Sequence, residues 1–273
     1  MEHGVRKLVF LVLLAFAISG WTAGHSFAFP SLDPLQAAGA KPAAPDSQKP
    51  KADAEERAVA ALTALNVPLG RDPSGKILWI EAGNGELTDE AMRHLPGLPT
   101  LEWLEIGGGK VTAAGMAFLK NCAALRRLYV HDVSLAGDAM EWLAGLRLQA
   151  LSLQRTGISG KVLQHMKAPG SLIVLNLSGN DILDDDLGLV ARFTGLEVLA
   201  LQDTKVTGAG LAGLKNMARL NVINLINCRI VDADLPVFHS MPNLRIVQAA
   251  GCNLSDQAVK ELTDKLTMLA VFR

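Results

Sequence analysis

The sequence predicts an α/β solenoid, in which short coils stack to place a parallel sheet along one side and short helices along the other. The pattern LxxLxL recurs through most of the chain, and its first positions are Ile77, Leu101, Leu125, Leu148, Leu172, Leu196, Leu220 and Leu244. The interval is 24 residues except between Leu125 and Leu148, where it is 23. Recurrence at a fixed period of this length is typical of repeat proteins.

Each repeat contains two kinds of hydrophobic period. In residues 196–217 the first three leucines, Leu196, Leu199 and Leu201, fit a short strand with one face inward. The later apolar residues, Leu211, Leu214 and Met217, are three apart and fit one stripe of a short helix. A single coil cannot bury such a stripe, so neighbouring coils must stack to form a continuous core.

The N-terminal segment is expected to be a targeting signal. Arg6 and Lys7 precede an apolar run of 11 residues, Leu8–Ile18, and Ser26 and Ala28 are small residues placed for cleavage after Ala28. We therefore expect residues 1–28 to be a signal peptide, with an uncleaved signal anchor as the alternative. Residues 29–52 are rich in Pro, Ala and Lys without a hydrophobic period, and predict a disordered tether.

Both ends of the array need a cap. Residues 53–65 predict an amphipathic helix and a Pro-Ser-Gly turn follows, so 53–76 is expected to form the N-terminal cap. Residues 77–273 then hold eight repeats. Leu266, Leu269 and Val271 repeat the strand pattern once more and predict a closing ninth strand.

The form LxxLxLxxTxVTxxGLxxLxx, as in residues 196–217, resembles the leucine-rich repeat family, in its 24-residue bacterial type related to ribonuclease-inhibitor-like arrays. The resemblance covers residues 77–273. It implies a curved, right-handed leucine-rich-repeat solenoid with the parallel sheet on the concave side and short helices on the convex side. It also implies a ladder position, often Asn, that is here Gly85, Gly109, Val133, Thr156, Asn180, Thr204, Cys228 and Cys252. Because only Asn180 is an asparagine, the ladder is expected to be patchy.

Residues with reactive or metal-binding side chains favour structural roles. Cys228 and Cys252 share the ladder position in adjacent repeats, which suits two buried thiols better than a disulfide. The acidic run 184–186 fits a helix N-terminus rather than a calcium loop, and the glycines at 107–109 fit a turn rather than a phosphate cradle. We expect no catalytic residues, no metal and no cofactor. A net charge of −1 gives no reason to expect nucleic acid as a partner.

The predicted concave face carries an unusual set of side chains in its first three repeats. If the leucines point inward, the residues between them point outward, and Trp79, Trp103 and Arg127 form one column across the strands. The other outward residues there are Glu81, Glu105, Tyr129 and His131. Trp, Tyr and Arg are the side chains that dominate binding hot spots. The later repeats present Val and Ile beside amides. The competing interpretation is that Trp79 and Trp103 only pack under the N-terminal cap.

These observations predict an exported, non-catalytic binding module whose ligand is a protein or peptide on the concave face. The alternative is carbohydrate or cell-wall binding through the two tryptophans, with Glu81 and Glu105 as hydroxyl partners. We expect a secreted or periplasmic monomer that has no membrane contact unless the signal segment stays uncleaved.

Overall fold

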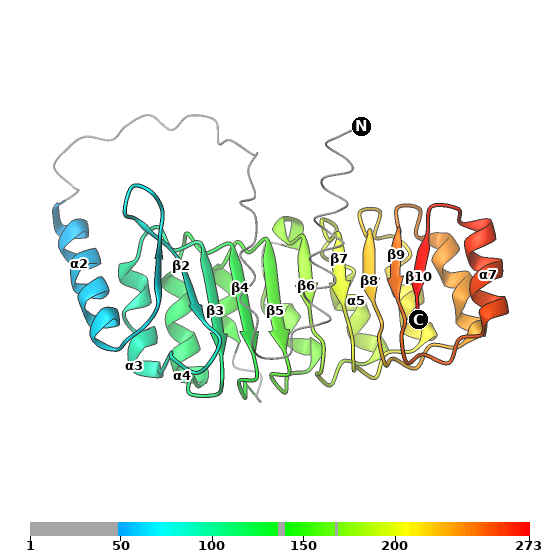
Figure 1. The fold of residues 1–273 in the computed structure, drawn as a ribbon, viewed down its shortest axis with the longest axis horizontal. Coiled ribbons are helices and arrows are strands. Elements are labelled where there is room, and N and C mark those ends of the chain that lie inside the picture. Colours follow the sequence, from blue (N-terminus) through cyan, green and yellow to red (C-terminus); the bar gives the residue numbers. More distant parts are fainter. Residues whose placement is uncertain (1–48, 136–139, 167–168) are drawn as a thin grey trace.

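The computed structural model describes residues 49–135, 140–166 and 169–273 as one continuous array of coils built on a ten-stranded sheet (Figure 1). The strands follow one another in sequence order across the sheet, and every pair from β2 to β10 is parallel. The strands are β1 Leu69–Arg71, β2 Ile77–Ala82, β3 Trp103–Gly107, β4 Arg127–His131, β5 Ala150–Gln154, β6 Val174–Asn176, β7 Val198–Ala200, β8 Val222–Asn224, β9 Ile246–Gln248 and β10 Ala270–Phe272.

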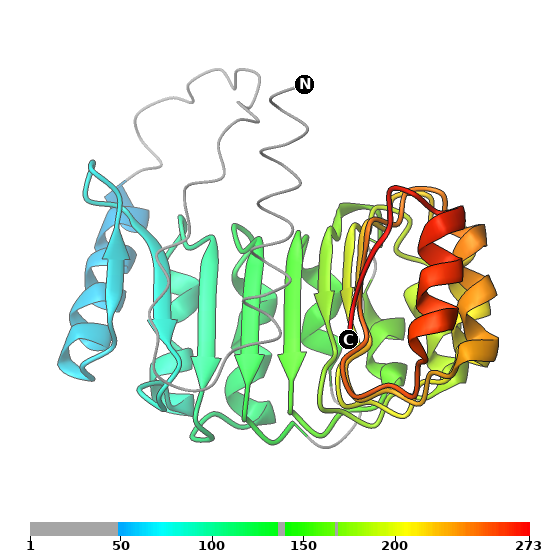
Figure 2. The same cartoon turned by 45° about the vertical axis from the view of Figure 1, so that its right-hand side comes forward.

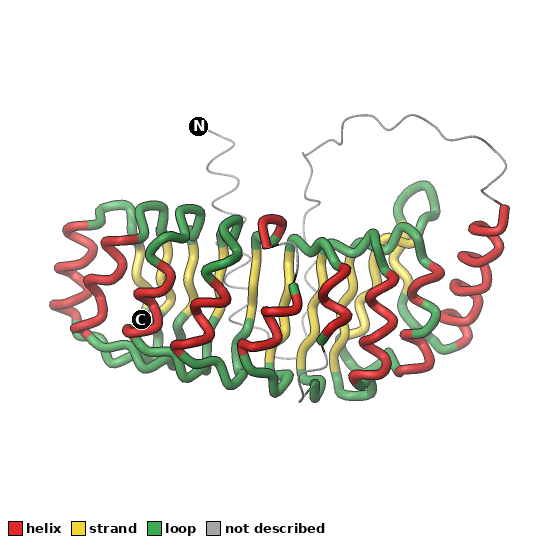
Figure 3. Tube along the Cα trace, turned by 180° about the vertical axis from the view of Figure 1, so that it is seen from behind, coloured by secondary structure: helices red, strands yellow, loops and turns green. Residues whose placement is uncertain are grey.

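Short helices cover one face of this sheet, as the view from behind shows (Figure 3). Most have one or two turns, and many are of the 3-10 type. They are α3 Asp89–Met92, η2 Leu95–Gly97, α4 Ala113–Met116, η3 Ala117–Asn121, η4 Glu141–Gly145, η5 Gly160–His165, η6 Pro169–Ser171, η7 Asp184–Asp186, α5 Leu187–Val190, α6 Gly208–Leu211, η8 Ala212–Leu214, η9 Asp232–Ser240 and α7 Asp256–Lys265. In the described ranges no helix combines the length and the apolar character needed to span a bilayer.

The core lies between the sheet and the helices. Leu104, Leu128 and Leu199 point into it from the strands and are 0% exposed, as are Leu211 and Leu214 from the helical side. In Figure 2 the first strands are seen face on while the last are seen nearly edge on, so the sheet is curved with its helix-free face inside. The predicted α/β solenoid, with a concave parallel sheet and convex helices, is confirmed.

The N-terminal end is closed by a helix and a hairpin. Helix α2 spans Lys49–Ala64 and buries Ala58 and Leu62. It begins four residues before the expected start at 53, because a proline is tolerated in the first turn of a helix and Pro50 does not prevent its start. Strand β1, which the sequence did not predict, pairs antiparallel with β2. The expected signal peptide, 1–28, and most of the expected tether, 29–52, lie outside the described residues.

The ladder between coils is more continuous than the sequence suggested. Asn180 Nδ2 donates to the Leu153 carbonyl at 2.5 Å, and its Oδ1 accepts from the backbone nitrogens of Thr156 and Gly157. Thr156 and Thr204 instead donate their hydroxyls to carbonyls in their own repeats, and Cys228 and Cys252 donate their thiols to carbonyls of the preceding repeat. The cysteines are free thiols, as expected. Hydroxyls and thiols therefore replace asparagine in the later repeats, whereas Gly85, Gly109 and Val133 have no such group.

The acidic residues at the helix starts connect neighbouring coils. Asp184 accepts hydrogen bonds from the backbone nitrogen and the hydroxyl of Thr207 in the next repeat, at 2.7 and 2.6 Å. The same paired bonds join Asp89 to Thr112 and Asp232 to Ser255. Asp184 is thus structural, and the three acidic residues of this kind lie in the first, fifth and seventh repeats.

A rim of residues with positive φ follows the strands. Its members are Gly108, Asp132, Arg155, Gly179, Asp203, Asn227 and Gly251, with φ between 50° and 78°. Along this rim, every third position is a glycine. Arg155 reaches back to Asp132 and lies over Gly179, and Asn227 reaches back to Asp203 and lies over Gly251. Gly179 and Gly251 leave the space that these side chains fill, whereas at Gly108 the backbone of residues 84–85 lies close.

The C-terminal coil is less well covered. Helix α7 buries Leu262, but Ala258, Val259 and Leu266 are only partly buried. Met268 and Phe272 are 71% and 44% exposed. Strand β10 pairs with β9 on one side only and forms the edge of the sheet.

Candidate ligand-binding site on the concave sheet

The strand register brings the predicted site residues together. Trp79 pairs with Trp103, and Trp103 with Arg127, so these three form one column across β2, β3 and β4. A second column consists of Glu81, Glu105 and Tyr129. His131 lies at the end of β4, opposite Gly107. These side chains alternate along the strands with the buried residues of the core, so the predicted arrangement is present on the concave face.

Trp79 belongs to the cap rather than to an open surface. It pairs with Gly70 of β1, and its indole lies over that glycine, where any side chain would collide with the ring. The competing interpretation, packing under the N-terminal cap, therefore describes Trp79. It does not describe Trp103, whose aromatic and cationic neighbours are in the next strand.

Trp103, Arg127 and Tyr129 form the centre of the site. The Trp103 and Tyr129 rings meet edge to face, with centroids 6.2 Å apart and an interplanar angle of 78°. The Arg127 guanidinium lies 5.5 Å from the centroid of the Trp103 ring, in a cation–π contact. All three side chains are only partly buried. Burial raises the pKa of Tyr129 to about 12, so its phenol stays protonated at neutral pH and can donate a hydrogen bond.

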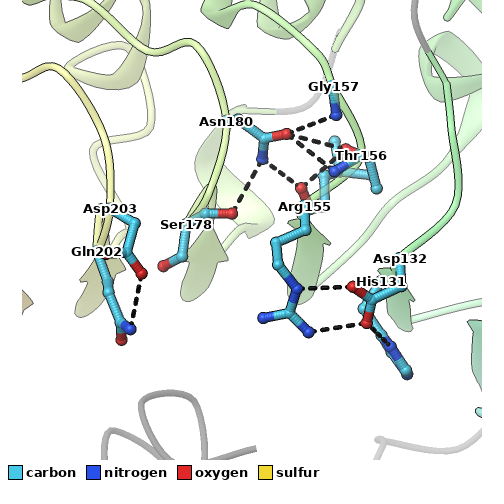
Figure 4. A network of polar contacts seen from close by, with 10 residues as sticks. His131, Asp132, Arg155, Thr156, Gly157, Ser178, Asn180, Gln202 and Asp203 are labelled. Atoms are coloured by element: carbon cyan, nitrogen blue, oxygen red, sulfur yellow. Dashed lines mark hydrogen bonds and ion pairs between the residues drawn. The ribbon is translucent and has the colours of Figure 1, made fainter. Parts of the chain in front are cut away.

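His131, Asp132 and Arg155 form a polar network (Figure 4), and His131 lies two residues after Tyr129 on β4. His131 Nε2 lies 3.2 Å from Glu105 Oε1, and His131 Nδ1 lies 3.0 Å from Asp132 Oδ2. Arg155 donates two hydrogen bonds to Asp132, at 2.7 and 2.8 Å. The sequence placed Glu105 outward and so predicted it to be accessible, but it is only 6% exposed. That expectation was wrong, because the His131 ring lies against the Glu105 carboxylate.

The charges of the network shift one another. Although burial opposes a positive charge on His131, the hydrogen bonds to Glu105 and Asp132 raise its pKa overall. Hydrogen bonding to Arg155 lowers the pKa of Asp132 to about 2. The same bond raises the pKa of Arg155. When His131 is protonated, the network is a chain of alternating charges across β3, β4 and β5.

Small residues make room for this network. A side chain at Gly107 would collide with the His131 ring and with the Gly83 carbonyl, and one at Gly83 would press on the Glu105 carboxylate. Gly107 thus ends strand β3, while Gly108 and Gly109, with φ of 78° and 80°, form the expected turn. Two glycines at the same strand position one repeat apart are the sequence signal for this space.

Sequence reasoning missed the role of Asp132 and Arg155. The pair could have been found from spacing, because the two residues are 23 apart, which is the length of the one short repeat. Residues one repeat apart in a solenoid stack at strand spacing. Arg155 also has φ of 50°, a conformation that non-glycine residues seldom adopt.

The concave face of β6 to β9 is neutral. Its outward column consists of Val174, Val198, Val222 and Ile246, and these side chains are only 6%, 1%, 0% and 6% exposed. They are nevertheless separate from the core between sheet and helices. Pointing away from the core is therefore not the same as exposure to solvent. The neighbouring outward positions hold Asn, Gln, Ser, Ala and Ile, so the charged side chains of this face are confined to its N-terminal half.

Within the described residues, no three His, Cys, Asp or Glu side chains are grouped as metal ligands. Burial raises the pKa of the Cys122 thiol to about 12 and also raises that of Cys228. Both thiols therefore keep their protons at neutral pH, which suits buried structural thiols rather than nucleophiles.

The repeat register, the concave parallel sheet and the convex helices define a leucine-rich-repeat solenoid. The chain is similar to internalin C2 of Listeria monocytogenes, with a TM-score of 0.58 and 23% sequence identity over 81% of this chain and 90% of that one. It is also similar to internalin F of Listeria monocytogenes, with a TM-score of 0.52 and 17% identity over 74% of this chain and 64% of that one. No model of a known protein family and no curated protein sequence matches the chain.

Proposed function

We propose that this protein is a non-catalytic binding module whose concave face holds a protein or peptide. The contact between Trp103, Arg127 and Tyr129 carries the proposal. An aromatic pair with an arginine over one ring, partly open on a concave sheet, has the composition of a binding hot spot. Glu81 and His131 lie at the edge of this patch, and Glu105 contacts His131 there. Leucine-rich-repeat folds such as those of the internalins are typically protein-binding, which favours the same conclusion.

The test is a capture experiment with the full chain. Wild-type protein and the variants Trp103→Ala and Tyr129→Ala are used to recover partners from the envelope of the native host. Phe118→Ala is the matched control, because Phe118 is an aromatic residue on the convex side and is 37% exposed. We expect both concave variants to lose the partner and the convex variant to keep it, with melting temperatures close to that of the wild type. Equal capture by all four proteins would contradict the proposal.

The glycan alternative has less support. It depended on two stacked tryptophans, but Trp79 packs over Gly70, and Arg127 occupies one side of the Trp103 ring. A glycan array decides between the two ligand classes: specific retention that Trp103→Ala abolishes would favour sugars.

We also propose that the chain is exported, with removal of residues 1–28 and with 29–52 acting largely as a tether, and that the mature protein is secreted or periplasmic. The charged and then apolar N-terminus, with Ser26 and Ala28 before the cleavage point, supports this. N-terminal sequencing of the protein from its own host tests it. An intact Met1 on a membrane-bound product would favour the anchor instead.

A further inference from the structure

Within the described residues, the binding patch carries one cation and one anion that have no counter-ion. Among the described residues, the Arg127 guanidinium makes no ion pair and no side-chain hydrogen bond. It lies over the Trp103 ring and interacts electrostatically with the Tyr129 phenol. The exposed Glu81 carboxylate likewise has no ion pair or hydrogen bond within the described part of the chain. Arginine offers five N–H donors in a planar fork, so an unpaired one on a partly buried surface is complementary to a carboxylate.

The other charged groups of this face are already neutralised. Glu105 is held by His131, with 8% of its side chain exposed, and Asp132 is held by Arg155. They therefore do not compete for a ligand's charges. Glu81 differs, because burial and the negative charge of Glu105 both raise its pKa. A cation placed beside Glu81 would relieve that repulsion.

The register sets the separation of the two unpaired groups. Glu81 lies on β2 and Arg127 on β4, so they are two strands apart across the sheet. Arg127 is also one outward position away from the column of Glu81 along the strand direction. With strands roughly 4.8 Å apart and about 3.3 Å per residue, the two Cα atoms are about 12 Å apart. An extended peptide covers this distance in three or four residues. The line between the two groups crosses β3 beside Trp103.

We propose that the ligand of this site is a peptide segment carrying an acidic and a basic side chain three or four residues apart, with the acid on Arg127, the base on Glu81 and an apolar residue between them against Trp103. This inference rests on the proposed function and names the partner's chemistry. The neutral concave face of β6 to β9 offers no rival site for either charge.

The experiment measures binding of three defined peptides to the full chain. All are acetylated and amidated hexapeptides with the same apolar centre: Gly-Asp-Leu-Val-Lys-Gly, the same peptide with two Asp, and the same peptide with two Lys. Each is titrated by thermophoresis at low salt against wild type, Glu81→Lys and Arg127→Glu. We expect wild type to prefer the mixed peptide about tenfold, Glu81→Lys to prefer the diacid and Arg127→Glu to prefer the dibasic peptide. High salt should reduce each preference.

Controls separate this inference from the proposed function. Lys205→Glu, on an exposed residue paired with Asp181 away from the patch, should keep the wild-type preference. Circular dichroism melts confirm that every variant folds. If wild type shows no preference for the mixed peptide, or if the two reversals do not switch it, the charge assignment is wrong. Should Trp103→Ala still abolish capture of the native partner in that case, the proposed function stands and only the ligand's chemistry is refuted.

Discussion

At the scale of single residues, the side chains at the ladder position between coils satisfy unequal numbers of backbone groups. Asn180 donates to backbone carbonyls of two repeats and accepts from the backbone nitrogens of Thr156, Gly157 and Ile158. Cys228 donates one thiol hydrogen bond to the Leu201 carbonyl, at 3.0 Å. The Thr204 hydroxyl also donates to that carbonyl. The cost of losing each residue should follow the number of backbone groups left without a partner.

We therefore expect Asn180→Ala to lower the free energy of unfolding by about 3 kcal/mol and Cys228→Ala by about 1 kcal/mol. The first change leaves several buried backbone groups without a hydrogen-bond partner. The second leaves none without any partner, because Thr204 still donates to the Leu201 carbonyl. Urea unfolding followed by circular dichroism measures both. Equal losses would mean that the thiol and the amide contribute alike, against the hydrogen-bond pattern described above.

His131 should make stability depend on pH. Its pKa is raised above the ordinary value of 6.5 by Glu105 and Asp132, so the protonated ring stabilises the folded state. This stabilisation is fully present below pH 6.5 and is lost as the pH rises through the folded-state pKa. We expect the difference in unfolding free energy between wild type and His131→Gln to shrink as the pH is raised above 6.5. Urea titrations at pH 5.5, 7.0 and 8.5 test this, and a difference that grows with pH would contradict it.

At the scale of elements, the Asp–Thr and Asp–Ser bonds on the convex side replace the contacts that long helices would make. Helix α6 has four residues, and its first turn is held by Thr207, which donates to Asp184 of the previous repeat. Helices this short are not stable alone. Their positions must come from the core and from these bonds between coils.

Substitution of Asp184 should therefore be costly while its neighbour is not. We expect Asp184→Ala to lower the free energy of unfolding by about 1–3 kcal/mol, since it leaves the Thr207 backbone nitrogen and hydroxyl without their partner. Asp185→Ala is the matched control, because Asp185 is exposed and makes no hydrogen bond or ion pair in the described structure. It should change stability by less than about 0.5 kcal/mol. Similar losses in the two variants would show that the acidic run acts only through its overall charge.

The repeats were predictable element by element because each strand and each helical stripe restates the same apolar pattern. Strand β1 was not predictable from the sequence. Its three residues, Leu69–Arg71, are too few to show a hydrophobic period, and their extended conformation comes from pairing with β2. Trp79 was placed in the right column, but the sequence did not show that Gly70 lies under its ring. Likewise, alternation gives the direction of Glu105 and Val198 but not what packs against them. Direction is a local property of a strand, whereas exposure depends on neighbours from other repeats.

At the scale of the whole molecule, the two ends of the array differ. Helix α2 and strand β1 cover the first coil and bury Ala58 and Leu62, whereas the last coil keeps Ala258, Val259 and Leu266 partly exposed. In a solenoid each coil is stabilised mainly by its immediate neighbours. The last coil has one such neighbour in the described structure, and a middle coil has two.

Amide hydrogen exchange should reveal this asymmetry. We expect peptides from residues 252–272 to exchange much faster than peptides from 196–220, and those from 77–100 to be protected nearly as well as the middle. Mass spectrometry at several exchange times measures the gradient. Uniform protection along the array would indicate that it unfolds as a single cooperative unit instead.

The recurrence of glycine at every third coil of the rim restricts how such a chain can change in length. On the convex side the acid and hydroxyl partners alternate every two repeats, as from Asp184 to Asp232, 48 residues apart. Along the rim a glycine recurs every three repeats, as from Gly179 to Gly251, which are 72 residues apart. Duplicating two repeats would preserve the first set of contacts and misalign the second, and duplicating three would do the reverse. Only an insertion of six repeats, or a multiple of six, keeps both sets of contacts in phase. The two different periods therefore restrict the changes in length that preserve all of these contacts.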